Sequence, residues 1–298
     1  FGAAAGMVYN AVLSTVVLWF PHIPTTISGF LLMSYGFSAA VFGPLSNLGI
    51  ERFGWRTTFR ALGVLALVIY AVCAQLVRCP TQEEAALLPQ AVKAKTAAAG
   101  RDMEPKQMLR QRSFWLYACW TVLMASVGMA LSGHASPIAQ SLGYTAGAAA
   151  MFAGLVSVCN GAGRLIFGTV YDRLGRKTLL VVPAVCVLGS ATLMLACSAV
   201  LPWLLVPAFL LLGLSFGASP VCSTGFIKST YGAAYYSMNL GLANLAVLIS
   251  AYVGPYVSGL LFERSGYSAV YVMMLGLALG GAAMAVVLQL SGKKEANS

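Results

Sequence analysis

Long apolar runs follow one another along the whole chain. Each is close to the roughly 20 residues that a helix needs to cross the hydrocarbon core of a bilayer. None alternates with the period of two typical of a membrane barrel, so the spans must satisfy their backbone hydrogen bonds as helices. The composition agrees, because 59% of the 298 residues are hydrophobic and only 9% are charged, against about a quarter in soluble domains. The sequence therefore predicts an all-α integral membrane protein.

The apolar runs predict nine membrane-spanning helices, divided by one long polar connection. The predicted spans cover residues 1–20, 26–48, 58–77, 114–133, 144–170, 179–200, 203–226, 235–261 and 269–290. The predicted units are a partial N-terminal helical bundle at 1–79, an inter-bundle linker at 80–112, a six-helix bundle at 113–291 and a tail at 292–298.

The distribution of basic residues predicts the orientation, because Lys and Arg accumulate on the cytoplasmic side of membrane proteins. If the linker is cytoplasmic, 13 of the 18 basic residues lie on its side and four lie on the other. This topology explains the net charge of +10 without nucleic acid. We expect a monomer in the cell membrane, surrounded by the lipid bilayer, with the linker and the C-terminus cytoplasmic.

An internal repeat relates the two parts of the chain. The motif Glu51-Arg52-x-Gly54-Trp55 recurs as Glu263-Arg264-x-Gly266-Tyr267, and each copy follows a Gly-Pro pair. Nearly the same offset relates the glycine pair at 2 and 6 to the pair at 213 and 217, which predicts a close helix contact in both copies. Pseudo-symmetric halves are typical of transporters. The repeat predicts a parent of twelve spans, of which this chain carries the fourth to the twelfth.

Arg164 is the basic residue that remains inside an apolar span. A charged side chain there costs at least ~3 kcal/mol, so Arg164 should face a wet cavity or an anion, which its planar fork binds through two parallel hydrogen bonds. Asn160 lies one turn away on the same face and can share the ligand. The alternative is that Arg164 caps carbonyls or extends to the membrane surface.

Other polar residues within the spans could line the same cavity or form contacts between helices. The predicted lining residues are Tyr9, Asn244 and Tyr252, and further candidates are Asn10, Tyr35 and Asn239. A gating motif is predicted in the turn after the Arg164 span, where charges would pair with neighbouring helix ends in one conformation and separate in another. Its residues are Gly168, Asp172, Arg173, Gly175, Arg176 and Lys177. The alternative is a charged loop that only sets topology.

The charged turn resembles a known family. The pattern Gly-x-x-x-Asp-Arg-x-Gly-Arg-Lys over 168–177 is similar to the signature loop between the eighth and ninth helices of the major facilitator superfamily. Further stretches resemble the oxalate/formate antiporters and monocarboxylate transporters of that superfamily. They are Asn160-Gly161-x-Gly163-Arg164, Tyr9-Asn10, Trp19-Phe20-Pro21 and Phe53-Gly54-Trp55-Arg56. The resemblance covers the whole chain.

The resemblance implies a carrier with one central anion site between two six-helix bundles that rock against each other. Arg164 occupies the position of the family's ligand for the substrate carboxylate. Two positions depart from the pattern. Asn160 replaces an aspartate that many monocarboxylate transporters use for proton coupling, and 235–261 lacks a lysine that some oxalate exchangers carry.

We therefore expect a secondary active transporter for small organic anions, working as an antiporter by alternating access. A carrier for another solute, including drug or metabolite efflux, and a truncated remnant that does not transport are alternatives. An enzyme would need convergent His, acidic or activated Ser groups in the membrane, which the sequence does not arrange. His22, His134 and the seven cysteines are interpreted as structural, so neither a cofactor nor a metal is expected.

Overall fold

The computed structural model describes residues 2–87, 102–197 and 202–297, and this part of the chain is helical without strands. The long helices are α1 (Gly2–Trp19), α2 (Pro24–Leu76), α5 (Arg112–Ser141), α6 (Ala146–Leu174), α7 (Thr178–Cys197), α8 (Leu205–Tyr231) and α9 (Tyr236–Asn297). The short ones are α3 (Gln82–Leu87), α4 (Pro105–Leu109) and the 3-10 turns Gly175–Lys177 and Pro202–Leu204. Within these ranges, five segments are long and apolar enough to cross a membrane: Leu48–Leu76, Arg112–Ser141, Ala146–Cys197, Leu205–Tyr231 and Tyr236–Ser291. The all-α membrane architecture predicted from the sequence is confirmed.

Two of the helices bend back at a glycine. In α2 the bend is at Gly54, with φ 75° and ψ 158°, and in α9 it is at Gly266, with φ 72° and ψ −169°. This backbone region is open essentially to glycine alone. Both glycines belong to the repeated motif, so its two copies form the same kind of turn.

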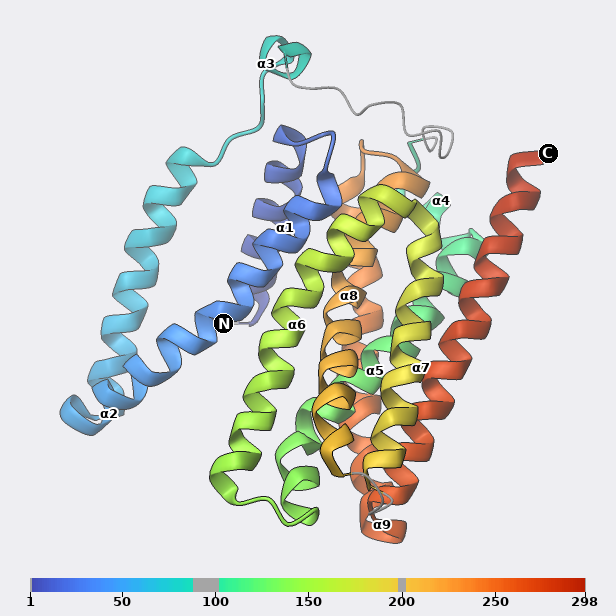
Figure 1. Ribbon diagram of the computed structural model, residues 1–298. Helices are drawn as coiled ribbons and strands as arrows, with labels where there is room; N and C mark the ends of the chain where they lie inside the picture. The colour runs from blue at the N-terminus through green and yellow to red at the C-terminus, as the bar shows by residue number, and fades with distance from the viewer. Residues whose placement is uncertain (1, 88–101, 198–201, 298) are drawn as a thin grey trace.

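Helices α5 to α9 pack side by side into one body (Figure 1). Aromatic side chains fill its centre, where the ring of Tyr117 stacks on Phe226 at 4.1 Å and on Trp120 at 5.7 Å between centroids. All three side chains are fully buried. Two hydroxyl contacts join α5 to α8 within this core, Tyr117 with Ser223 at 2.8 Å and Ser113 with Tyr231 at 2.9 Å.

Glycines bring the backbones of α6 and α8 into direct contact. A Cβ at Gly217 would overlap the carbonyl oxygen of Asn160, and one at Gly213 would lie 2.7 Å from the Cβ of Cys159. A Cβ at Gly163 would overlap the carbonyl of Leu214. The predicted contact at 213 and 217 is therefore confirmed. Its expected counterpart at Gly6 is not found within the described residues, where no atom lies within 4 Å of an added Cβ.

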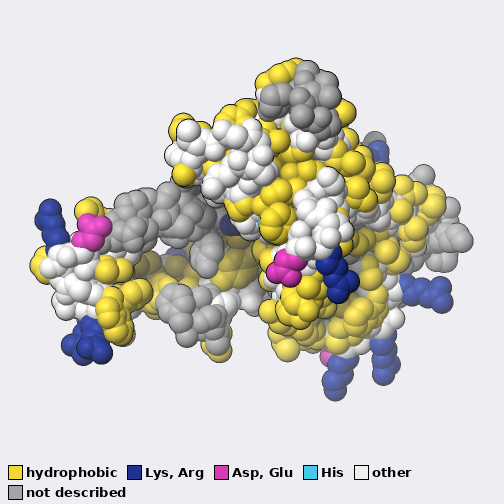
Figure 2. Space-filling model, turned by 90° about the horizontal axis from the view of Figure 1, so that it is seen from below, with side chains coloured by type: hydrophobic (Ala, Val, Ile, Leu, Met, Phe, Trp, Pro, Cys, Tyr) yellow, Lys and Arg dark blue, Asp and Glu magenta, His cyan; other side chains and the backbone are white. Residues whose placement is uncertain are grey.

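The first arm of α2 crosses α6, whereas its second arm stands apart from the body (Figure 1). A Cβ at Gly29 would overlap the carbonyl of Arg164, so the two helices touch at that level. The second arm exposes apolar side chains such as Leu67 and Leu76, which are 71% and 74% exposed. Hydrophobic side chains also cover most of the face seen in Figure 2, with Lys and Arg in small groups, one of them over the α2 bend.

The α1–α2 connection, the α6–α7 turn and the α8–α9 turn lie at one end of the molecule, which we call the linker end (Figure 1). The predicted gating motif and Lys228 lie at this end, and the bends of α2 and α9 lie at the other. This arrangement agrees with the charge distribution expected from the sequence. That the linker end faces the cytoplasm stays a prediction.

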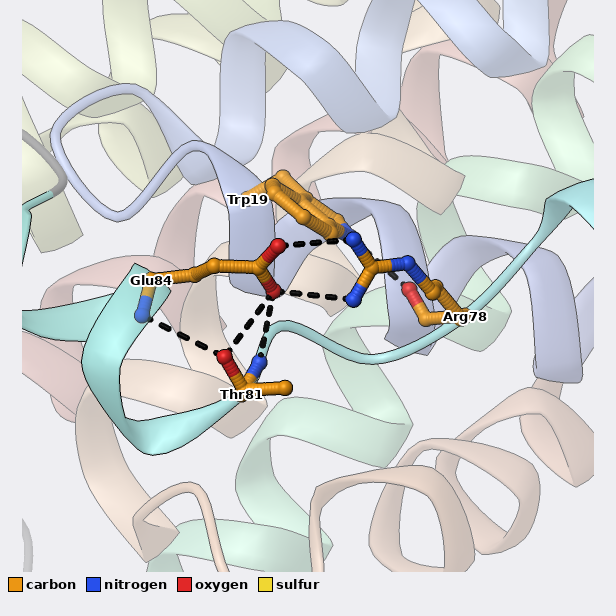
Figure 3. Close-up of polar contacts among 4 residues, drawn as sticks. All are labelled: Trp19, Arg78, Thr81 and Glu84. Carbon is orange, nitrogen blue, oxygen red and sulfur yellow. Dashed lines mark hydrogen bonds and ion pairs between the residues drawn. The ribbon is translucent and has the colours of Figure 1, made fainter.

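The start of the linker is fastened to α1 (Figure 3). The guanidinium of Arg78 donates two hydrogen bonds to the Glu84 carboxylate, at 2.9 and 2.7 Å, and lies over the ring of Trp19. The Trp19 indole donates to the carbonyl of Arg78 at 2.8 Å. These bonds, together with those from Thr81, lower the pKa of Glu84 to about 2, with the Arg78 hydrogen bonds as the largest cause.

The other end of the linker is fastened to the α8–α9 turn. The carboxylate of Asp102 accepts hydrogen bonds from the backbone N–H groups of Ala233 and Ala234, at 2.9 and 3.1 Å. The N–H of Met103 donates to the carbonyl of Tyr231, and the Asn239 side chain donates to the carbonyl of Met103. The two ends of the linker thus attach to different parts of the molecule.

Candidate functional site

Arg164 lies in the middle of α6 and reaches across to α2. Its Nε donates to Oδ1 of Asn160 at 3.0 Å, and one terminal nitrogen donates to the backbone carbonyl of Leu32. The i, i+4 spacing on a helix places Asn160 and Arg164 on one face, as the sequence predicts. Both side chains are half-buried, and Gly217 allows the α8 backbone to pass directly beside them. The guanidinium is thus held between the first and the second part of the chain.

A cavity of about 180 Å³ opens beside this arginine. Its lining comes from six helices: Tyr9 of α1, Leu32 of α2, Ala125 and Met129 of α5, Asn160 and Arg164 of α6, Phe216, Ser219 and Pro220 of α8, and Val247 of α9. None of these lining residues is acidic, and most are apolar. Arg164 therefore gives the cavity a positive charge in low-polarity surroundings, where a charge acts strongly on a ligand.

Ser219 is a lining residue that the sequence reasoning missed. Its side chain is 1% exposed, and its hydroxyl has no hydrogen-bond partner among the described residues. A buried hydroxyl without a partner costs free energy, so a ligand in the cavity that bonds to Ser219 recovers that cost. The following Pro220 has no N–H, which removes the regular helical donor to the carbonyl of Phe216. A Ser-Pro pair inside an apolar helix was the signal available in the sequence.

The structure brings three of the five predicted lining residues, Arg164, Asn160 and Tyr9, to this cavity. Asn244 is half-buried on α9 but is not among its lining residues. Tyr252 is 66% exposed and stacks on Tyr256 instead. A role for Asn244 or Tyr252 stays a prediction, without support from this cavity.

The additional polar candidates have different surroundings. Asn239 is fully buried and bonds to the linker at Met103. Asn10 is half-buried, with its Oδ1 unpaired among the described residues. The side chain of Tyr35 lies outside the described residues. Within the described residues, Asn10 and Asn239 therefore each have a side-chain carbonyl oxygen without a hydrogen-bond partner.

Asp172 connects the predicted gating motif to the first turn of α2. Its carboxylate accepts hydrogen bonds from the N–H groups of Thr25 and Thr26, at 3.1 and 2.7 Å, and from the hydroxyl of Thr26 at 2.7 Å. The N-terminal N–H groups of a helix lack intrahelical acceptors and carry partial positive charge, so a carboxylate is favourable there. Gly168 supports this approach, because a Cβ there would lie 2.7 Å from the carbonyl of Thr25.

The remaining residues of the motif shape the turn and face other helices. Gly175 has φ +57°, which glycine adopts without strain. The guanidinium of Arg176 lies 5.0 Å from the ring centre of Phe226, and its backbone carbonyl accepts a hydrogen bond from Gln289. Arg173 and Lys177 are exposed. Of the charged residues in the motif, Asp172 makes the contact with α2.

Neither histidine belongs to the Arg164 cavity. The Nε2 of His134 lies 3.0 Å from the Ser258 hydroxyl, and His22 is exposed. The described residues contain no group of three His, Cys, Asp or Glu side chains that could hold a metal. The seven cysteines are free thiols.

Fold and site together define a helical membrane protein with a charged cavity among helices from both parts of the chain. The Major Facilitator Superfamily model matches residues 1–250 and 135–297, and the chain belongs to this superfamily. Members of this superfamily are membrane transporters and not enzymes. The resemblance inferred from the charged turn is thereby confirmed.

Individual relatives are similar at low identity. The oxalate:formate antiporter of Oxalobacter formigenes is 25% identical over 286 residues, covering 91% of this chain and 63% of the relative. Monocarboxylate transporter 12-B of Danio rerio is 24% identical over 93% of this chain and 63% of its own length. Multidrug resistance protein D of Escherichia coli is 26% identical over 58% of this chain and 44% of its own. The chain therefore spans less than two thirds of the length of these relatives.

Proposed function

We propose that this protein is a secondary carrier for small organic anions, with Arg164 binding the substrate carboxylate. The observation that carries the proposal is a cavity without acidic lining residues that Arg164 lines together with Ser219, whose hydroxyl has no hydrogen-bond partner among the described residues. A guanidinium keeps its charge at physiological pH, and its planar fork matches a carboxylate. An anion in this cavity meets the guanidinium of Arg164 and the hydroxyl of Ser219, whereas a cation is repelled by the guanidinium.

The printed names of two relatives fit the same substrate class. One is an oxalate:formate antiporter and the other a monocarboxylate transporter, and each is similar to more than nine tenths of this chain. A lining with a single basic residue favours one carboxylate over two. The surrounding Met129, Phe216 and Val247 suit a short apolar substituent. We therefore infer a preference for monocarboxylates, with exchange rather than proton symport because no Asp or Glu lines the cavity.

Transport by this route requires two conformations of the contact between α2 and α6. With Asp172 bonded to the first turn of α2, the two helices are joined at the linker end. Release of this contact lets the first part of the chain move away from the α5–α9 body. Asp172 thus acts as a latch in alternating access, with the linker end cytoplasmic in the cell membrane.

The test combines binding with counterflow in proteoliposomes. Formate, lactate and oxalate are offered to the purified chain, and its thermal stability and the counterflow of labelled anion are measured. Arg164→Gln should abolish both the anion-dependent stabilisation and the counterflow, while Arg164→Lys keeps part of the binding. Arg264→Gln, an exposed arginine beside the α9 bend, is the matched control and should behave as the unchanged chain. Stabilisation that survives Arg164→Gln would exclude Arg164 as the ligand.

A carrier for lipophilic compounds is the second candidate. The mostly apolar lining of the cavity favours it, as does the similarity to a multidrug resistance protein over 58% of the chain. This function predicts stabilisation by neutral or cationic amphipathic compounds and no effect of Arg164→Gln. The same binding measurement therefore separates the two candidates.

A further inference from the structure

We infer a second site for small carboxylate anions, formed around Lys228 at the linker end. A cavity of about 130 Å³ lies there between α1 and the α8–α9 turn. Its lining residues are Ser14, Thr15, Val17, Leu18, Cys79, Lys228, Ala233, Ala234, Tyr236 and Ser237. It shares no lining residue with the Arg164 cavity.

Lys228 is the charged residue that lines this cavity. It is half-buried in the last turn of α8, and within the described residues no hydrogen bond or ion pair engages its ammonium group. The carboxylate of Asp172 acts on it only through space, since its oxygens accept three hydrogen bonds from Thr25 and Thr26. An ammonium group withdrawn from water without an acceptor is favourably placed to bind an anion.

The other carboxylate near the cavity is also engaged. Asp102 accepts hydrogen bonds from the N–H groups of Ala233 and Ala234, both lining residues. The lining residues Thr15, Tyr236 and Ser237 also carry hydroxyl groups, whereas the hydroxyl of Ser14 bonds to the carbonyl of Asn10. The site therefore offers one point charge with a few hydroxyl donors, which suits a small singly charged anion.

The position of the cavity gives this site a role. Lys228 follows Ser219 by nine residues on α8, a separation of ~13.5 Å along the helix at 1.5 Å per residue. A carboxylate held at Lys228 thus lies outside the Arg164 cavity, toward the linker end. We assign Lys228 as an entry site that raises the local concentration of anions before they reach Arg164, as positively lined clefts do.

Cys79 provides a reporter that does not depend on transport. It is an exposed free thiol in the lining of the same cavity. In a variant whose other exposed cysteines, Cys73 and Cys119, are replaced by Ser, the purified chain is labelled with anionic and cationic methanethiosulfonates. The ratio of the anionic to the cationic labelling rate should be several-fold higher at Cys79 than for a free thiol in solution. Acetate or lactate should slow this reaction.

Lys228→Gln should remove both the charge preference and the protection by carboxylates. Lys177→Gln, an exposed lysine at the same end, is the matched control and should leave both intact. Equal labelling in Lys228→Gln and in the parent would overturn the site. Protection by vesicles of anionic phospholipid but not by acetate or lactate would overturn it in favour of a lipid phosphate.

The labelling result is independent of the proposed function. Arg164→Gln should leave the charge preference and the protection at Cys79 unchanged, because Arg164 lines a different cavity. If protection requires Lys228 while counterflow is absent, the second site stands and the transport proposal fails. If counterflow is intact while Cys79 shows no dependence on Lys228, the transport proposal stands and the second site fails.

Discussion

The two copies of the repeated motif form the same turn in very different surroundings. Gly54 of α2 and Gly266 of α9 share the same positive-φ conformation. Beyond Gly266 the second arm of α9 is packed, with Val270, Met274 and Ala278 fully buried. Beyond Gly54 the second arm of α2 exposes its apolar side chains. The local motif thus specifies the turn, whereas neighbouring helices decide how much of the following arm is buried.

Membrane helices gain little from hiding apolar surface from lipid, so close packing and specific polar contacts determine their association. The α5–α9 body has such contacts in its aromatic core and at the glycines between α6 and α8. The first arm of α2 has them at Gly29 and at the hydrogen bonds to Asp172. The second arm of α2 makes few contacts with the rest of the described chain, which explains why it stands apart.

Substitution at Gly217 should have the largest effect, because this glycine lies in the closely packed contact between α6 and α8. Gly217→Val places side-chain atoms on the carbonyl of Asn160 and should lower stability by about 3 kcal/mol. The equivalent Gly6→Val enters open space and should change stability by less than ~0.5 kcal/mol. Thermal unfolding in detergent measures both. Equal losses of stability in the two variants would show that Gly6 and Gly217 are packed alike, which would contradict the difference between the two copies of the repeat.

The bends provide the next test. Gly266→Ala forces alanine into a glycine-only conformation and should cost about 2 kcal/mol. Gly54→Ala introduces the same strain, but the loosely packed arm beyond it can shift and relieve part of it, so its loss should be smaller. An added Cβ meets no atom of the described residues within 4 Å at either glycine, so the comparison isolates backbone strain. Thermal unfolding of the two variants decides the order.

The contact that joins α2 to the body should be weaker than the packing inside it. Asp172→Asn keeps the shape but loses the charge opposite the N-terminus of α2, which should weaken the contact by about 1 kcal/mol. Hydrogen exchange should then accelerate about fivefold at the amides of Thr25 and Thr26. Arg173→Gln should leave both rates unchanged. Unchanged exchange in Asp172→Asn would show that the charge does not hold the latch.

The sequence predicted the helices and Arg164 because each depends on local rules. Apolar runs of span length must be helices, and an arginine within one needs a polar environment. The bends at Gly54 and Gly266 lie in the gaps between predicted spans, whereas the sequence reasoning used the repeated motif only as a sign of an internal repeat. The Arg164 cavity was only partly predicted, because its lining comes from six helices whose relative rotation no single span encodes. Ser219 was missed and Tyr252 was included for this reason.

The clamp at the start of the linker should produce the smallest effect, because it is exposed. The pKa of Glu84 is lowered to about 2, so the clamp is intact above the ordinary glutamate pKa of ~4.3. It should weaken as the pH falls from there toward 2, when Glu84 is protonated and Arg78 releases it. The fluorine NMR signal of 5-fluorotryptophan at position 19 should shift over this range, since the Trp19 indole bonds to the carbonyl of Arg78.

Two variants separate this response from general acid unfolding. Glu84→Gln should remove the pH dependence of the Trp19 signal, and Trp19→Phe assigns that signal. The fluorotryptophan signal at Trp120, in the core of the α5–α9 body, should stay constant over the same range. A simultaneous change at Trp19 and Trp120 would mean that acid acts on the whole molecule. A change at Trp19 alone would show that the contact between α1 and the start of the linker loosens while the α5–α9 body keeps its structure.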